Sequence, residues 1–230
     1  MGMTEEEKQN IKEQFNDIVS NGIAPILKAA NFKRRGNNFH AHMGDVDWCI
    51  NIQKSRWGFD DYYNTWQFTI NIGITWTDYI ICLFNKACDF PLESSCPLRA
   101  RIGNFMGKGD YWFVLRPYHD HLPIKEQICT TIKNKILPLL YDINCFDDAW
   151  KYTIKNRSWY RSLTKLFHIG TKQEVFEINA FGFYMLCLES GKEEKANIFR
   201  KQMERCGANT EFLDKILDTY KKYKEYKAIR

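Results

Sequence analysis

The stretch FHAHMGDVDWCINIQKSR, residues 39–56, together with WQFTINIGI, residues 66–74, decides the fold. Apolar and polar residues alternate with a period of two along 39–43, 46–53 and 66–72, and Gly44-Asp45 supplies turn residues. This alternation predicts neighbouring antiparallel strands that each bury one face. We expect residues 54–65 between the second and third strands to form a polar, aromatic loop.

Helices and further strands extend outward from this sheet. Thr4 and Glu7 have the spacing of a capping box, so a helix is expected from Glu5, with Pro25 either kinking it or restarting it. The basic turn 33–36 ends that helical region. Residues 98–102 and 111–115 read as two more strands joined by a hairpin-type turn at 107–110, and 79–87 as a short helix or a strand. Later helices are expected over 124–141, 174–189 and 192–206, and from about residue 210. The predicted class is α+β: a mainly antiparallel sheet of about five strands with an N-terminal helix and C-terminal helices.

Composition sets the broad class of protein. The chain has 230 residues, 44% hydrophobic and 27% charged, with a net charge of +5. These values are typical of a globular protein and do not demand an acidic partner. The sequence begins MGMTEEEKQN without an apolar core, and its eight cysteines include no C-x-x-C pair. We therefore expect a cytoplasmic protein with reduced thiols and no membrane partner.

Three regions are predicted: an α+β domain at 1–150, a basic aromatic connector at 151–172, and a helical appendage at 173–230. The connector carries six Lys or Arg residues and no Asp or Glu. Cations interleaved with aromatic rings suit single-stranded nucleic acid, whereas the plainer interpretation is a surface connector docked on the core. The candidate nucleic-acid patch comprises Lys151, Lys155, Arg157, Trp159, Tyr160, Arg161 and Lys165.

The polar face of the predicted sheet is the main candidate binding site. Its amide, hydroxyl, imidazole and guanidinium groups could hydrogen-bond a peptide or an anionic ligand through many weak contacts. The alternative is an ordinary solvated sheet face, or one covered by the C-terminal helices. The candidates are His40, His42, Asn51, Gln53, Gln67, Thr69, Asn71, Arg99 and Arg101.

Metal binding and catalysis receive little support from the sequence. His40 and His42 share one side of a strand, and His119 and His121 form a second cluster, but nothing in the sequence brings the clusters together. Gly107-Lys108-Gly109 lacks the frame of a phosphate-binding loop, and no nucleophile elbow or H-E-x-x-H motif is present. We expect no catalytic residue, metal site or cofactor.

Four segments resemble one known family: NFKRRGNNF (31–39), INIQKSR (50–56), FTINIGI (68–74) and LRARIGNFMGKGDYWFVL (98–115). Together they are similar to the bacterial "domain of unknown function 4304" family, over roughly residues 10–145. The resemblance supports the fold. It also implies a small bacterial accessory protein, for which an immunity or defence locus is a plausible setting.

The leading functional prediction is non-enzymatic binding of another protein, in the manner of an immunity protein or antitoxin that neutralises a toxin by direct contact. Such a protein needs only a complementary surface. The alternative is nucleic-acid binding through 151–172, and an unrecognised enzyme comes third.

Overall fold

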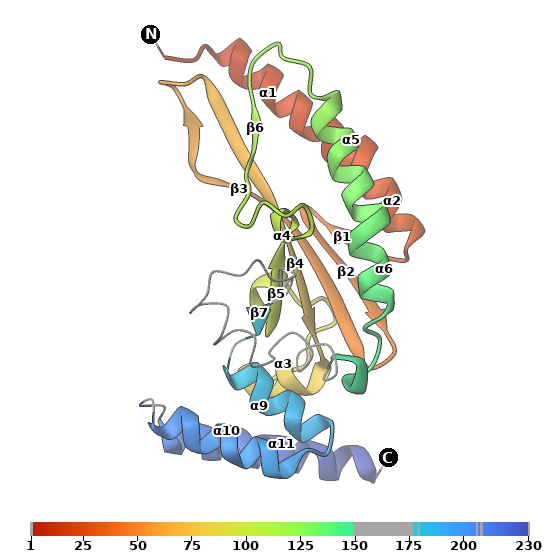
Figure 1. Ribbon diagram of the computed structural model, residues 1–230, viewed down its shortest axis with the longest axis vertical. Coiled ribbons are helices and arrows are strands. Elements are labelled where there is room, and N and C mark those ends of the chain that lie inside the picture. The colour runs from red at the N-terminus through yellow and green to blue at the C-terminus, as the bar shows by residue number, and fades with distance from the viewer. Residues whose placement is uncertain (1, 150–176, 179, 206, 208, 230) are drawn as a thin grey trace, which may run out of the picture.

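The computed structural model (Figure 1) describes residues 2–149, 177–178, 180–205, 207 and 209–229. A helical segment opens the chain, an antiparallel sheet follows, and helices close it, so the predicted α+β class is confirmed. The first part of the chain contains α1 (Glu5–Asp17), the π-helical turn η1 (Ile18–Ile23), α2 (Ala24–Ala29), β1 (Lys33–Arg35), β2 (Asn38–Met43), β3 (Val46–Asp60), β4 (Thr65–Thr75) and α3 (Thr77–Phe84). The remainder contains η2 (Glu93–Ser95), β5 (Leu98–Arg101), α4 (Ile102–Phe105), β6 (Phe113–Leu115), α5 (Leu122–Thr131), η3 (Ile132–Ile136), α6 (Leu137–Tyr141), β7 (Glu177–Ile178), α9 (Ala180–Glu189), α10 (Glu193–Arg205) and α11 (Thr210–Ala228).

The sheet has the strand order β1-β2-β3-β4-β5-β7, and β6 pairs with β4 beyond the end of β5. Every pairing is antiparallel. Ile50 lies opposite Ile72 and Ile52 opposite Ile70, so the predicted apolar face is continuous from strand to strand. The alternation in the sequence therefore predicted correctly which face of β2, β3 and β4 is buried.

Three connections differ from the prediction. Residues 54–65 were expected to form a loop, but β3 continues to Asp60 and pairs with Thr65 and Trp66 of β4. The expected hairpin over 107–110 is wrong, because β5 and β6 do not pair with each other. They pair end to end with the same edge of β4, and α4 lies between them in the chain. The expected basic turn at 33–36 contains the short edge strand β1.

Helices cover the apolar face of the sheet. In Figure 1 the segments α1–α2 (red) and α5–α6 (green) run side by side along this face. Phe15 of α1 packs edge-on against Trp66 and Phe68 of β4, with ring centroids 5.0 and 5.2 Å apart. Pro25 lies in the first turn of α2, directly after the π-helical turn η1, and helical backbone angles continue from η1 into α2. The hydrophobic core thus lies between one sheet face and two long helical segments.

The C-terminal part of the chain adds one strand to the sheet and then forms helices that pack near α3. Strand β7 pairs with β5, opposite Leu98 and Arg99. Helices α9, α10 and α11 (blue) lie at the end of the sheet where α3 is found (Figure 1). Helix α9 begins at Ala180, later than the expected residue 174, and the Asn209 side chain caps α11 by accepting a hydrogen bond from Phe212 N. The basic connector 151–172 lies outside the described residues.

Candidate interaction surface on the sheet

Strand register places the nine predicted polar residues on the same side of the sheet, opposite the helices. One row crosses four strands, with Asn38, Asn51, Asn71 and Arg101 directly opposite one another in turn. In the next row, His40, Cys49, Gly73 and Arg99 occupy the same four strands. Residues spaced by two along a strand point to the same face of the sheet. The alternation in the sequence is therefore sufficient to predict which residues form this face.

The centre of this polar face hydrogen-bonds to itself. The Asn51 amide donates to Asn38 Oδ1 at 2.8 Å, and the Asn71 amide donates to Gln53 Oε1 at 2.7 Å. Arg101 Nε donates to Asn71 Oδ1 at 3.3 Å. Asn71 is buried. These hydrogen bonds link β2, β3, β4 and β5 across the polar face and stabilise the sheet.

A loop covers one end of the polar face and contacts β2, β3, β4 and β5. Phe90 packs edge-on against His40, with centroids 5.3 Å apart, and the Cys49 thiol donates to the Pro91 carbonyl at 3.2 Å. Arg99 Nε donates to the buried Glu93 carboxylate at 2.6 Å. We call residues 90–96 the cover loop. It makes this part of the face an internal interface rather than a solvated one.

The four histidines that the structure describes lie in two separate places, His40 with His42 and His119 with His121. His40 Nε2 and His42 Nδ1 both contact a single atom, Asp47 Oδ1, at 2.7 and 3.1 Å. His121 instead contacts Asp17 of α1 at 2.8 Å, on the helical side of the sheet, so the structure does not bring the two histidine clusters together. Across the part of the chain that the structure describes, no three His, Cys, Asp or Glu residues are grouped so as to hold a metal ion.

Strand β3 contains a large bulge between Lys54 and Phe59, away from the cover loop. Lys54 pairs with Phe68 and Phe59 with Trp66, so residues 55–58 together lie across from Gln67 alone. Gly58 adopts a φ of +71°, a conformation that favours glycine. Bulges of this kind re-aim side chains and interrupt pairing at sheet edges.

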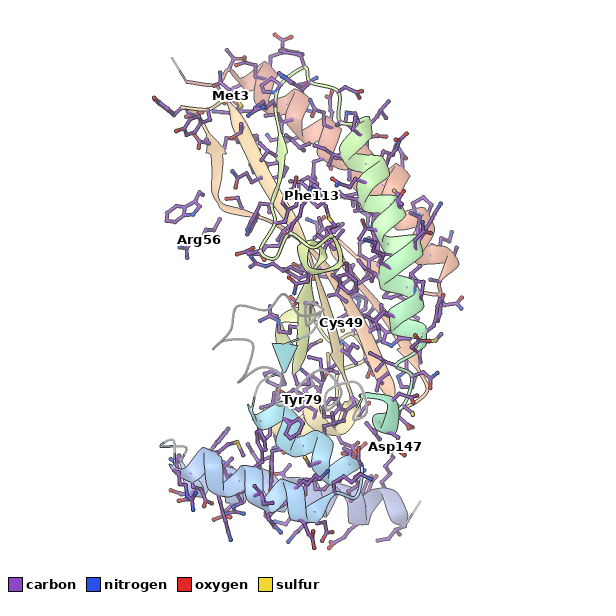
Figure 2. The ribbon with its side chains drawn as sticks, in the orientation of Figure 1. Met3, Cys49, Arg56, Tyr79, Phe113 and Asp147 are labelled. Carbon is purple, nitrogen blue, oxygen red and sulfur yellow. The ribbon has the colours of Figure 1, made fainter. Side chains whose placement is uncertain are left out.

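Two bulge residues form an exposed, preassembled pair. Trp57 is 80% exposed, and the Arg56 guanidinium lies 4.5 Å from its ring centroid. Figure 2 shows Arg56 at the outer edge of the molecule, on the opposite side from α5. Across β4, the exposed Gln67 lies opposite the 37% exposed Val114 of β6. We call Arg56, Trp57, Gln67 and Val114 the bulge surface.

Of the bulge surface, only Gln67 was among the predicted site residues. Trp57 was missed because residues 54–65 were interpreted as a loop, in which an aromatic residue carries no positional meaning. The available signal was Gly58 inside an otherwise alternating stretch, which marks a bulge.

The sequence model of a family described as "Domain of unknown function (DUF4304)" matches residues 23–142. The chain belongs to the DUF4304 family. No curated protein and no solved structure matches the chain. The DUF4304 match contains β1 to β6 and the whole bulge surface, so the candidate surface is part of the family domain.

A buried charge cluster joins the DUF4304 domain to the last helix. Lys224 of α11 lies 2.7 Å from Asp78 of α3 and 2.6 Å from Glu189 of α9, and both carboxylates are buried. Burial raises the pKa of the Glu189 carboxyl to about 7; the Lys224 hydrogen bond opposes this shift and nearby Asp78 adds to it. The cluster therefore holds α9 and α11 against the domain.

Within the described residues, no helix combines the length and apolar composition needed to cross a membrane.

Proposed function

We propose that this DUF4304 protein acts by binding another protein and that the bulge surface is the centre of the contact. The observation that carries the proposal is the exposed Trp57 with Arg56 stacked on it. Trp and Arg are the residue types most enriched among residues that dominate binding energy at protein interfaces. Because the cation already contacts the ring, less side-chain entropy is lost when the pair is buried.

The charges nearby favour a protein over a nucleic acid. Asp60 and Asp61 follow the bulge along the same hairpin and are exposed, as are Glu5 and Glu6 at the start of α1. Met3 N donates to Asp61, which ties this end of α1 to the hairpin. Carboxylates beside the bulge would repel a phosphate backbone, whereas a mixture of both charges is usual around a protein interface.

An immunity or antitoxin-like role is the narrower form of this proposal. In that form the partner is a toxin, and binding alone neutralises it. If the captured partner is toxic when expressed alone and harmless when co-expressed with this chain, the narrower form is supported.

The test begins with co-purification from the native host using the tagged full chain, with and without nuclease. The Trp57→Ala variant should lose the captured protein, because truncation of a central interface residue typically weakens affinity by about 30-fold. Phe212→Ala is the matched control, since Phe212 is also exposed, at 53%, but lies on α11. That variant should retain the partner.

Two results would contradict the proposal. A partner that binds Trp57→Ala and the unchanged chain equally would place the contact elsewhere. Material that disappears on nuclease treatment would transfer the function to nucleic-acid binding, for which the basic segment 151–172 is the candidate. The melting temperature of each variant shows whether it is folded; Trp57→Ala should change it little because the side chain is exposed.

A further inference from the structure

Two cysteines meet beneath the cover loop. Cys49 lies on the polar side of β3, directly opposite Gly73 of β4. Cys96 ends the cover loop, and a Cβ added at Gly73 would lie 2.6 Å from Cys96 Sγ and 2.7 Å from its Cβ. Cys96 therefore fills the space that a side chain at Gly73 would take. Because directly opposed Cβ positions in an antiparallel sheet are about 5 Å apart, this location places Cys96 beside Cys49.

The contacts of the two thiols agree with that placement. The Cys49 thiol is among the groups that raise the pKa of the Cys96 thiol, which agrees with the two lying next to each other. Each also donates to the cover loop: Cys49 to the Pro91 carbonyl at 3.2 Å, and Cys96 to the Leu92 carbonyl at 3.6 Å. Both are reduced and buried. Figure 2 shows Cys49 in the interior of the molecule.

We propose that Cys49 and Cys96 are a site of reversible disulfide formation that fastens the cover loop to β3. The oxidant is a small-molecule disulfide such as oxidised glutathione. One protein thiolate attacks it, forming a mixed disulfide and releasing one thiol. The second protein thiolate then attacks the protein sulfur, closing the Cys49–Cys96 bond and releasing the second thiol. The protein loses two electrons and two protons, and the oxidant becomes two reduced thiols.

Burial controls when the reaction occurs. Desolvation raises the pKa of the Cys96 thiol well above its ordinary value, and the neighbouring Cys49 thiol adds to the shift. The attacking thiolate is therefore scarce while the cover loop is closed. Oxidation requires the loop to open, and the disulfide then holds it closed over His40 and Gly73. The pair consequently responds to sustained oxidation rather than to a brief exposure.

The test uses the full chain incubated with oxidised glutathione or, as a control, with reduced glutathione. Remaining thiols are alkylated under denaturing conditions, and peptides are mapped by mass spectrometry without reduction. The expected product is a linked Cys49–Cys96 peptide that dithiothreitol separates. Because the disulfide closes the long chain segment between Cys49 and Cys96, it should also raise the melting temperature by at least about 3 °C. Cys96→Ser should show neither effect, whereas Cys82→Ser, which alters another buried thiol, should show both.

The exposed Cys88 provides an internal reference for the same experiment. If Cys88 becomes glutathionylated while Cys49 and Cys96 are recovered as free, alkylated thiols, the proposal is overturned. It is equally overturned if either residue is found linked mainly to a different cysteine. Both readings come from the unchanged chain and do not depend on whether a variant folds.

Discussion

At the level of single residues, Gly73 shows how one position determines its surroundings. It lies within β4, where glycine is normally unfavourable because it lacks a side chain that packs. Here the absence of a side chain admits Cys96 and brings the cover loop onto the sheet. The close approach of the loop, rather than a special backbone angle, accounts for the glycine.

Replacing Gly73 with Ala should therefore destabilise the protein by about 1–3 kcal/mol, because the new methyl group overlaps Cys96 and overpacks the site. Urea unfolding monitored by tryptophan fluorescence would measure the loss. Adding Cys96→Gly removes the overlapping side chain, so the double variant should lose less than the sum of the two single losses. Strict additivity would show that the overlap is not the cause.

The sequence was sufficient to predict which face of the sheet each residue lies on. It was not sufficient to predict which of these residues a loop covers. Alternation placed His40, Asn51 and Asn71 on the polar face correctly, because strand periodicity depends only on local geometry. The burial of His40 beneath Phe90 depends on the path of a loop 50 residues further along the chain. That path is set by tertiary contacts, such as Glu93 with Arg99, which have no local signature.

At the level of elements, Asp17 joins α1 to α5. Its carboxylate accepts hydrogen bonds at 2.8 Å from both Lys125 and His121. A third comes from Asn21 at 2.7 Å. These hydrogen bonds, the one from Lys125 foremost, hold the pKa of Asp17 below its ordinary value. The charged carboxylate therefore stabilises the contact between the two helices.

Asp17→Asn should destabilise the fold by about 1 kcal/mol at neutral pH, since the site is partly exposed and the pair is partly screened. A depressed carboxyl pKa contributes stability above its unfolded value of 3.8 and loses it as the pH falls further. The difference in unfolding free energy between the two proteins should thus shrink below about pH 4. Thermal unfolding at pH 7 and pH 3 measures it. A difference that is the same at both values would contradict this role for the charge.

Which elements could be predicted depended on what defines them. The strands at 39–43, 46–53 and 66–72, the first helix and its capping box follow from local patterns, and the structure contains them. The extension of β3 and the end-to-end arrangement of β5 and β6 do not, because both are determined by pairing with β4. The exposed pair of Arg56 and Trp57 was overlooked for the same reason.

At the level of the whole molecule, the cluster of Asp78, Glu189 and Lys224 connects three helices from distant parts of the chain. The two buried carboxylates share Lys224, and Lys227 Nζ lies 3.9 Å from Asp78 Oδ1. Because the pKa of Glu189 is raised from 4.5 to about 7, the folded protein retains a proton there that the unfolded chain releases. The contribution of this group to stability consequently falls as the pH rises from about 4.5 to about 7, and changes little above that.

Glu189→Gln should remove this dependence, since the amide cannot titrate. The unfolding free energy of the unchanged chain should fall more between pH 5 and pH 7.5 than that of the variant, measured by urea unfolding in matched salt. Asp218→Asn, which alters an exposed acid elsewhere on α11, should keep the pH dependence of the unchanged chain. Parallel curves for Glu189→Gln and the unchanged chain would contradict the assignment.

The most direct test of the proposed function is the affinity of the purified partner for three forms of the chain, measured by calorimetry. We predict that the partner binds the unchanged chain and Phe212→Ala with the same Kd and binds Trp57→Ala about 30-fold more weakly. If all three forms bind equally, the bulge surface is not the interface, and the proposal that it is the centre of protein binding is wrong.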